Sequence, residues 1–131
     1  MTQLKPHHVG LVVSDLERST EFYRALGFET VSDIPFDDGS RAIRFIRSGE
    51  LELELFWYAE TPPRPAAAAG GKQLGFRHLA FLVDDIDEVV DELKSAGIMP
   101  GEVMVRDVPI GFRIAFFQDP DGLEIELTQT V

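Results

Sequence analysis

The chain repeats itself, and each copy carries a histidine and a glutamate at matching places. The segment that opens at His8 returns at His78, 70 residues later. Each copy ends in alternating acidic and apolar residues, over 50–56 and 123–127. Two similar modules related by a pseudo-two-fold axis can together offer a divalent metal ion two imidazoles and two carboxylates. Such a ligand set leaves coordination positions open for a substrate.

Composition narrows the classes of protein that this chain can belong to. The 131 residues suit one compact domain spanning 1–131, and 44% of them are hydrophobic, enough for a real core. The formal net charge of −11 argues against nucleic acid as a partner. The chain has no cysteine, which rules out disulfides and thiolate ligands. We found neither a signal peptide nor an apolar run near the ~20 residues that cross a bilayer, so we expect a cytoplasmic protein with no membrane partner.

Hydrophobic periodicity and turn residues predict the order βαβββ, written twice. In each copy an acidic or hydroxyl residue caps the helix, at Ser14-Asp-Leu-Glu17 and at Asp85-Ile-Asp-Glu88, and a glycine stops it. The predicted strands are 7–13, 28–34, 41–48, 51–58, 76–83, 102–107, 112–118 and 123–129, and the predicted helices run from the first capping box to about Leu26 and over 86–96.

These elements predict an α+β fold of two tandem βαβββ modules, each a curved mixed sheet with one helix. The first module covers 7–58 and the second 76–129. Between them, 59–75 contains prolines, an alanine run and a glycine pair, which is typical of a linker. A flap over a site is the functional alternative for this segment.

Strand alternation sorts the candidate histidines by face. His8 shares a face with Gly10, and His78 shares one with Ala80, while the bulkier neighbours point to the other side. The bulky set should pack on the helices, which leaves the histidine faces with little side-chain volume, as in a ligand cavity. His7 is expected to point to the opposite face, as a surface or edge residue.

The glutamates are less easily assigned, because acidic alternation on a strand usually means a face turned to solvent. Two pairs keep an offset of 72 residues, Glu52 with Glu124 and Glu54 with Glu126. Periodicity alone does not choose between them.

The residues assembled so far resemble the vicinal oxygen chelate superfamily, which includes glyoxalase I, methylmalonyl-CoA epimerase, extradiol dioxygenases, and fosfomycin and bleomycin resistance proteins. The likeness covers essentially the whole chain and is greatest to small bacterial glyoxalase-I-like proteins. The matching segments are His8–Leu16, Phe22-Tyr23, Leu26-Gly-Phe28, Leu53–Phe56, Arg77–Phe81 and Phe116–Leu127, the last containing Asp-Pro-Asp-Gly.

The resemblance implies four metal ligands, His8, Glu54, His78 and Glu126. It also implies that Glu126 is the catalytic base, with Glu54 as its opposite partner. Two histidines and two glutamates suit Zn, Ni, Co, Mn or Fe(II) with two positions open to water or substrate. This set looks most like glyoxalase I, because the dioxygenases and fosfomycin enzymes have histidine at the position of Glu54.

The implied function is that of a divalent-metal-dependent lyase or isomerase of glyoxalase I type, lactoylglutathione lyase-like, in which the metal stabilises an enediolate and a carboxylate moves the proton. Val12 stands where glutathione-dependent enzymes carry an arginine, so the small-molecule substrate is expected to differ from the glutathione adduct. Arg113 and Arg44 are candidates for holding an anionic substrate.

By the same resemblance, two chains are expected to form a homodimer with shared active sites, each metal drawing two ligands from each chain. A monomer closed by its own two modules is the alternative. The alternatives from other functional classes are an Fe(II) dioxygenase-like enzyme and a small-molecule binding or resistance protein without turnover.

Overall fold

The chain divides into two compact units, Met1–Pro63 and Arg64–Val131. The computed structural model describes residues 2–65 and 72–131. Each unit has the order βαβββ and one four-stranded mixed sheet, so the predicted α+β fold of two tandem modules is confirmed. Residues 66–71, the middle of the predicted linker 59–75, lie outside the described residues.

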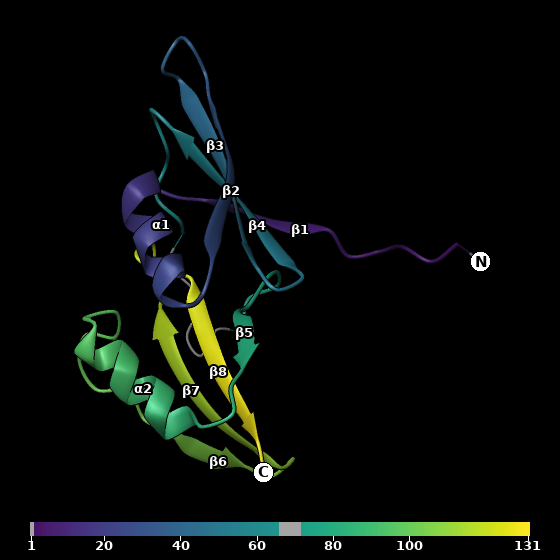
Figure 1. Ribbon diagram of the computed structural model, residues 1–131, viewed down its shortest axis with the longest axis vertical. Coiled ribbons are helices and arrows are strands. Elements are labelled where there is room, and N and C mark those ends of the chain that lie inside the picture. Colours follow the sequence, from purple (N-terminus) through teal and green to yellow (C-terminus); the bar gives the residue numbers. More distant parts are fainter. Residues whose placement is uncertain (1, 66–71) are drawn as a thin grey trace. The chain divides into compact units, whose positions relative to one another are not determined.

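The first unit is a sheet in the order β1-β4-β3-β2 with one helix (Figure 1). Its elements are β1 (His8–Val12), α1 (Leu16–Ala25), β2 (Glu29–Pro35), β3 (Arg41–Ser48) and β4 (Leu51–Tyr58). The strands β1 and β4 run parallel, and the other pairs are antiparallel. The first strand of the module therefore lies beside its last strand.

The second unit repeats this topology in the order β5-β8-β7-β6. Its elements are β5 (Leu79–Leu82), α2 (Ile86–Ser95), β6 (Arg106–Val108), β7 (Phe112–Gln118) and β8 (Glu124–Thr130). Again the first strand of the module is parallel to the last. Neither helix, of ten residues each, is long and apolar enough to cross a membrane, among the described residues.

The helix ends follow the sequence signals, with one correction at the first cap. The N-cap of α1 is Asp15 rather than Ser14, because the Asp15 carboxylate accepts a hydrogen bond of 3.0 Å from the backbone N–H three residues on. Asp85 caps α2 in the same way. Beyond the C-termini, Gly27 and Gly97 have φ values of 102° and 74°, a region that favours glycine.

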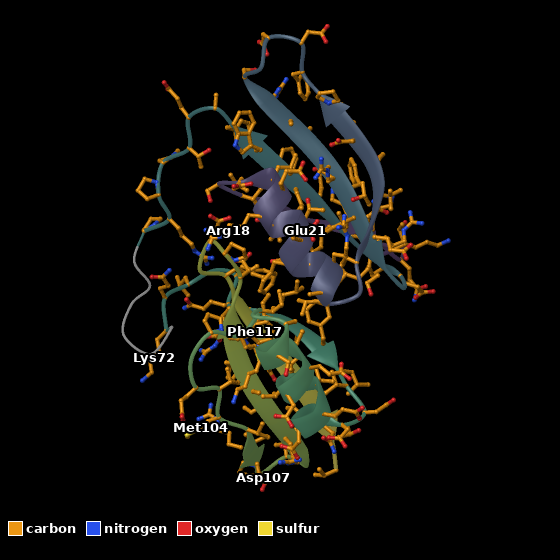
Figure 2. All side chains as sticks on the ribbon, turned by 60° about the vertical axis from the view of Figure 1, so that its left-hand side comes forward. Arg18, Glu21, Lys72, Met104, Asp107 and Phe117 are labelled. Atoms are coloured by element: carbon orange, nitrogen blue, oxygen red, sulfur yellow. The ribbon has the colours of Figure 1, made fainter. Side chains whose placement is uncertain are left out.

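Alternation along the last strand of each unit separates core from site. Leu53 and Leu55 of β4 and Ile125 of β8 are fully buried, and Leu127 of β8 is almost so. These side chains share the sheet face that carries the helix. Phe117 of β7, labelled in Figure 2, is buried on the same side of its sheet. The glutamates between these apolar residues must therefore point to the opposite, helix-free face.

A buried arginine joins the helix to the edge strand in the first unit. Arg44 of β3 donates to the Thr20 hydroxyl at 2.9 Å and to Glu17 of α1 at 3.0 Å. It also bonds Asp33 of β2 through two nitrogens, at 3.0 and 3.2 Å. These hydrogen bonds, chiefly that to Asp33, raise the pKa of the Arg44 guanidinium. One side chain thus connects three elements on the helix-bearing face.

The second unit contains the same arginine clamp. Arg113 of β7 lies 2.9 Å from Asp87 of α2 and 3.4 Å from Asp107 on the edge strand β6, labelled in Figure 2. The hydrogen bond from Arg113 lowers the pKa of the Asp87 carboxyl. Asp87 follows Glu17, its counterpart in the first unit, by the same 70 residues that separate the histidines.

Candidate metal centre

The first histidine and its glutamate lie on the helix-free face of the first sheet. Register places Glu54 of β4 directly beside Gly10 of β1, two residues from His8 on the same face. His8 Nε2 is 3.9 Å from Glu54 Oε1. The side chains are 38% and 17% exposed, so solvent reaches the imidazole more readily than the carboxylate. A nitrogen and an oxygen at this separation face each other without a hydrogen bond.

The surroundings of His8 orient its ring. Its Nδ1 lies 2.7 Å from the Nδ1 of His7, and the Phe45 ring meets it edge-on at 6.0 Å between centroids. His7 is exposed and lies outside β1, as predicted for a surface or edge residue, and its ring also contacts that of His8. A partner on Nδ1 leaves Nε2 available toward Glu54, as in metal sites where the second ring nitrogen is hydrogen-bonded.

In the second unit the histidine and the glutamate lie closer together than in the first. His78, just before β5, places Nε2 at 2.8 Å from Glu126 Oε2. Its ring packs edge-on against Phe116 at 5.7 Å, as His8 packs on Phe45 in the first unit. The other carboxylate oxygen of Glu126 accepts a hydrogen bond of 2.8 Å from the hydroxyl of Thr128. Both oxygens of Glu126 are thus engaged.

The alternative glutamates have different neighbours. Glu52 pairs with Arg47 of β3 at 3.1 Å, which occupies its carboxylate. Glu124 lies 3.7 Å from Nδ1 of His78, longer than a hydrogen bond. The Nδ1 atom is buried without a hydrogen-bond partner. In both units the geometry favours the pair Glu54 and Glu126 over the pair Glu52 and Glu124 as partners of the histidine Nε2 atoms.

The arginines predicted to hold a substrate do not lie on these faces. Arg44 and Arg113 point toward the helices, where carboxylates hold them. Their positions give no support to the predicted substrate contact of either arginine. Arg106 of β6, which sequence reasoning did not single out, has its guanidinium carbon 5.9 Å from the centre of the Phe116 ring. Register pairs it with Ile114, on the same face as Phe116.

The residues present suit a divalent metal ion by the chemistry of their donors. Each unit offers one imidazole nitrogen and one carboxylate oxygen, and imidazole with carboxylate suits Zn, Ni, Co, Mn and Fe(II). Within the described residues, no group of three or more candidate ligands lies together. Among the described residues, each unit therefore presents one such imidazole and carboxylate pair.

Comparison with known proteins places this arrangement in a family. Residues 5–127 match the model of the Glyoxalase/Bleomycin resistance protein/Dioxygenase superfamily. The uncharacterized protein YwkD of Bacillus subtilis is 37% identical over 92% of this chain and 93% of its own length. A probable lactoylglutathione lyase of a Synechocystis species is 30% identical, covering 94% of this chain and 93% of that protein.

The fold agrees with a solved structure. The glyoxalase family protein from Enterococcus faecalis superposes with a TM-score of 0.78 at 35% identity, covering 95% of this chain and 96% of that one. The sequence match extends through both modules, from just before His8 to just beyond Glu126. On these grounds the chain belongs to the glyoxalase, bleomycin resistance protein and dioxygenase superfamily.

Proposed function

We propose that the protein is a divalent-metal-dependent enzyme of glyoxalase I type, a lyase or isomerase that moves a proton next to a carbonyl. The observation that carries this proposal is the recurrence of a histidine Nε2 beside a glutamate oxygen on the helix-free face of each sheet, at 3.9 and 2.8 Å. A fold alone does not justify an activity, because this scaffold serves several functions. The repeated donor pair adds specific chemistry to the fold.

In this proposal the two pairs act on one ion. His8 and His78 would bind it through Nε2, and Glu54 and Glu126 would bind it through carboxylate oxygens. A bound divalent ion supplies a Lewis acid that polarises a carbonyl and acidifies the adjacent C–H. Glu126 takes that proton, and Glu54 faces the opposite side of the substrate. Phe45 and Phe116 pack edge-on against the histidine rings and would help to orient them.

The residues around the pairs suggest a small anionic substrate other than the glutathione adduct. Val12, 53% exposed, lies on the face of His8 in place of an arginine. Arg106 is the guanidinium on the face of the second pair, and within the described residues it has no ion-pair partner. A charged carboxylate or phosphate group of a substrate would suit it.

The test is proton exchange, because it needs no knowledge of the final product. The metal-loaded protein is incubated in deuterated water with a panel of 2-oxo and 2-hydroxy acids and of hemithioacetals formed with different thiols, and exchange at the carbon next to the carbonyl is followed by NMR. We expect exchange with at least one anionic member, and less with the glutathione adduct. If a panel member binds tightly but none exchanges with Zn, Ni, Co, Mn or Fe(II), the protein is a binding module. Oxygen uptake with Fe(II) would instead indicate dioxygenase chemistry.

A further inference from the structure

The two histidine–glutamate pairs differ in how firmly the carboxylate is held. Glu126 Oε2 is within hydrogen-bond distance of His78, at 2.8 Å, while Glu54 Oε1 stands 3.9 Å from His8. The two glutamates are almost equally exposed, at 14% and 17%. Burial therefore does not explain the difference, and the cause must lie in the neighbours of each carboxylate.

The neighbour that holds the Glu126 carboxylate is Thr128. It follows Glu126 by two positions in β8, so both side chains are on the helix-free face. The Thr128 hydroxyl donates a 2.8 Å hydrogen bond to Glu126 Oε1, the oxygen that does not face His78. A carboxylate held at one oxygen by a hydroxyl and at the other by an imidazole has little freedom to rotate.

Among the described residues of the first unit, no hydroxyl holds Glu54 in this way. The position that precedes Thr128 by the repeat offset of 72 is Phe56, whose ring donates no hydrogen bond. Among the described residues, Glu54 accepts no hydrogen bond from any side chain. The Phe56 ring instead packs beside Gly10, where an added Cβ would come within 3.4 Å of it. The repeat is thus broken at one position that bears directly on a proposed metal ligand.

We propose that Thr128 is a positioning residue that presets Glu126, so that His78 and Glu126 form the half of the metal site that is already assembled before the ion arrives. The inference rests on the proposed function. With Oε1 hydrogen-bonded to Thr128, Oε2 is the oxygen that lies beside His78 Nε2 and would bind the ion, and Oε1 keeps a second lone pair. Glu54 is then the ligand that must turn toward the ion as it binds.

The experiment is a titration of the metal-free full chain with Co²⁺. Calorimetry measures the Kd, and the visible absorption bands report the geometry of the ligands around cobalt. Thr128→Val keeps the branched shape and removes the hydroxyl. We expect a Kd about 10–100-fold higher, as for loss of other groups that orient a metal ligand, and altered absorption bands. Thr128→Ser restores the hydroxyl and should return both readouts to within about threefold of the original.

The matched control is Thr130→Val, which removes the next hydroxyl on the same face of β8. It should leave the Kd and the spectrum unchanged. Thr128→Ala, which needs no added packing volume, replaces Thr128→Val should the latter fail to fold by circular dichroism. Equal Co²⁺ affinity and spectrum in the hydroxyl-free variant and the original protein would overturn the role of Thr128. An original protein that binds no Co²⁺ would overturn the proposed function as well, which separates the two failures.

Discussion

At the scale of single residues, the two carboxylates have unequal surroundings, and this sets the expectation for their substitution. Glu126→Gln keeps a ligand oxygen but removes the proposed base. Once a substrate is found by the exchange assay, this variant should lower kcat by a factor of about 10²–10⁴ with a smaller effect on metal content.

Glu54→Gln is the matched comparison, since it makes the same chemical change in the other module. It should lower kcat less than Glu126→Gln does, because Glu54 is proposed as the opposite partner rather than the base. Metal content measured by plasma spectrometry on both variants separates lost chemistry from lost metal. Equal kcat in Glu126→Gln and the original protein would exclude Glu126 as the base.

Sequence reasoning found the residues of the two pairs because both pattern and family motif point to them. It missed the side chains that orient those pairs. Thr128 could have been found, since a hydroxyl two residues after a glutamate shares its face on a strand. The contact between His7 and His8 could not have been found from the sequence. His7 lies just before β1, and the alternation of faces along a strand does not govern the ring of a residue outside it.

At the scale of elements, the arginine clamps hold each helix to its sheet. Arg44→Met removes four hydrogen bonds that join β3 to α1 and β2. The freed carboxylates are well exposed and regain water, so the cost should be moderate, about 1–3 kcal/mol in the free energy of unfolding. Urea denaturation measures it.

The control for Arg44→Met is Arg24→Gln, which breaks an ion pair with Glu21 on the exposed side of α1. Both partners there are more than half exposed, so the loss should stay below about 0.5 kcal/mol. A similar loss in the two variants would mean that Arg44 serves as an ordinary surface charge and does not join the three elements.

The ion pair between Arg113 and Asp87 in the second unit should make the stability of the protein depend on pH. Arg113 lowers the pKa of the Asp87 carboxyl in the folded protein, below the value of about 3.9 that an unfolded aspartate has. The contribution of the ionised group is therefore present above that value and lost as the pH falls through the folded pKa. The difference in stability between the original protein and Asp87→Asn should shrink as the pH is lowered from about 5 to about 2.

Urea denaturation across that pH range measures the effect, with Asp91→Asn on the same helix as the control. A difference that does not change with pH would mean that the ion pair to Arg113 does not form in solution.

The bounds of some strands were predicted accurately, and those of the edge strand β6 were not. The alternating strands that became β3 and β7 match their predicted ranges, because their apolar residues face a helix. The edge strand β6 was predicted at 102–107 and found at Arg106–Val108, since an edge strand with one partner carries a weak apolar pattern. That error hid Arg106, whose face follows only from its true register with Ile114.

At the scale of the whole molecule, each unit presents only two of the four proposed ligands. A complete set therefore needs two units, either from one chain or from two. By the family resemblance we expect a homodimer in which each metal draws two ligands from each chain. Light scattering of the metal-loaded protein should give a mass near twice the 14.6 kDa of one chain. A mass of one chain with metal still bound would exclude the shared arrangement.

The most direct measurement is a crystal structure of the metal-loaded protein, with the ion located by anomalous scattering. We predict one ion for each chain, bound by Nε2 of His8 and His78 and by carboxylate oxygens of Glu54 and Glu126, at about 2.0–2.3 Å. An ion bound elsewhere, or four side chains that face separate surfaces of the assembled protein, would contradict the metal centre and the chemistry built on it.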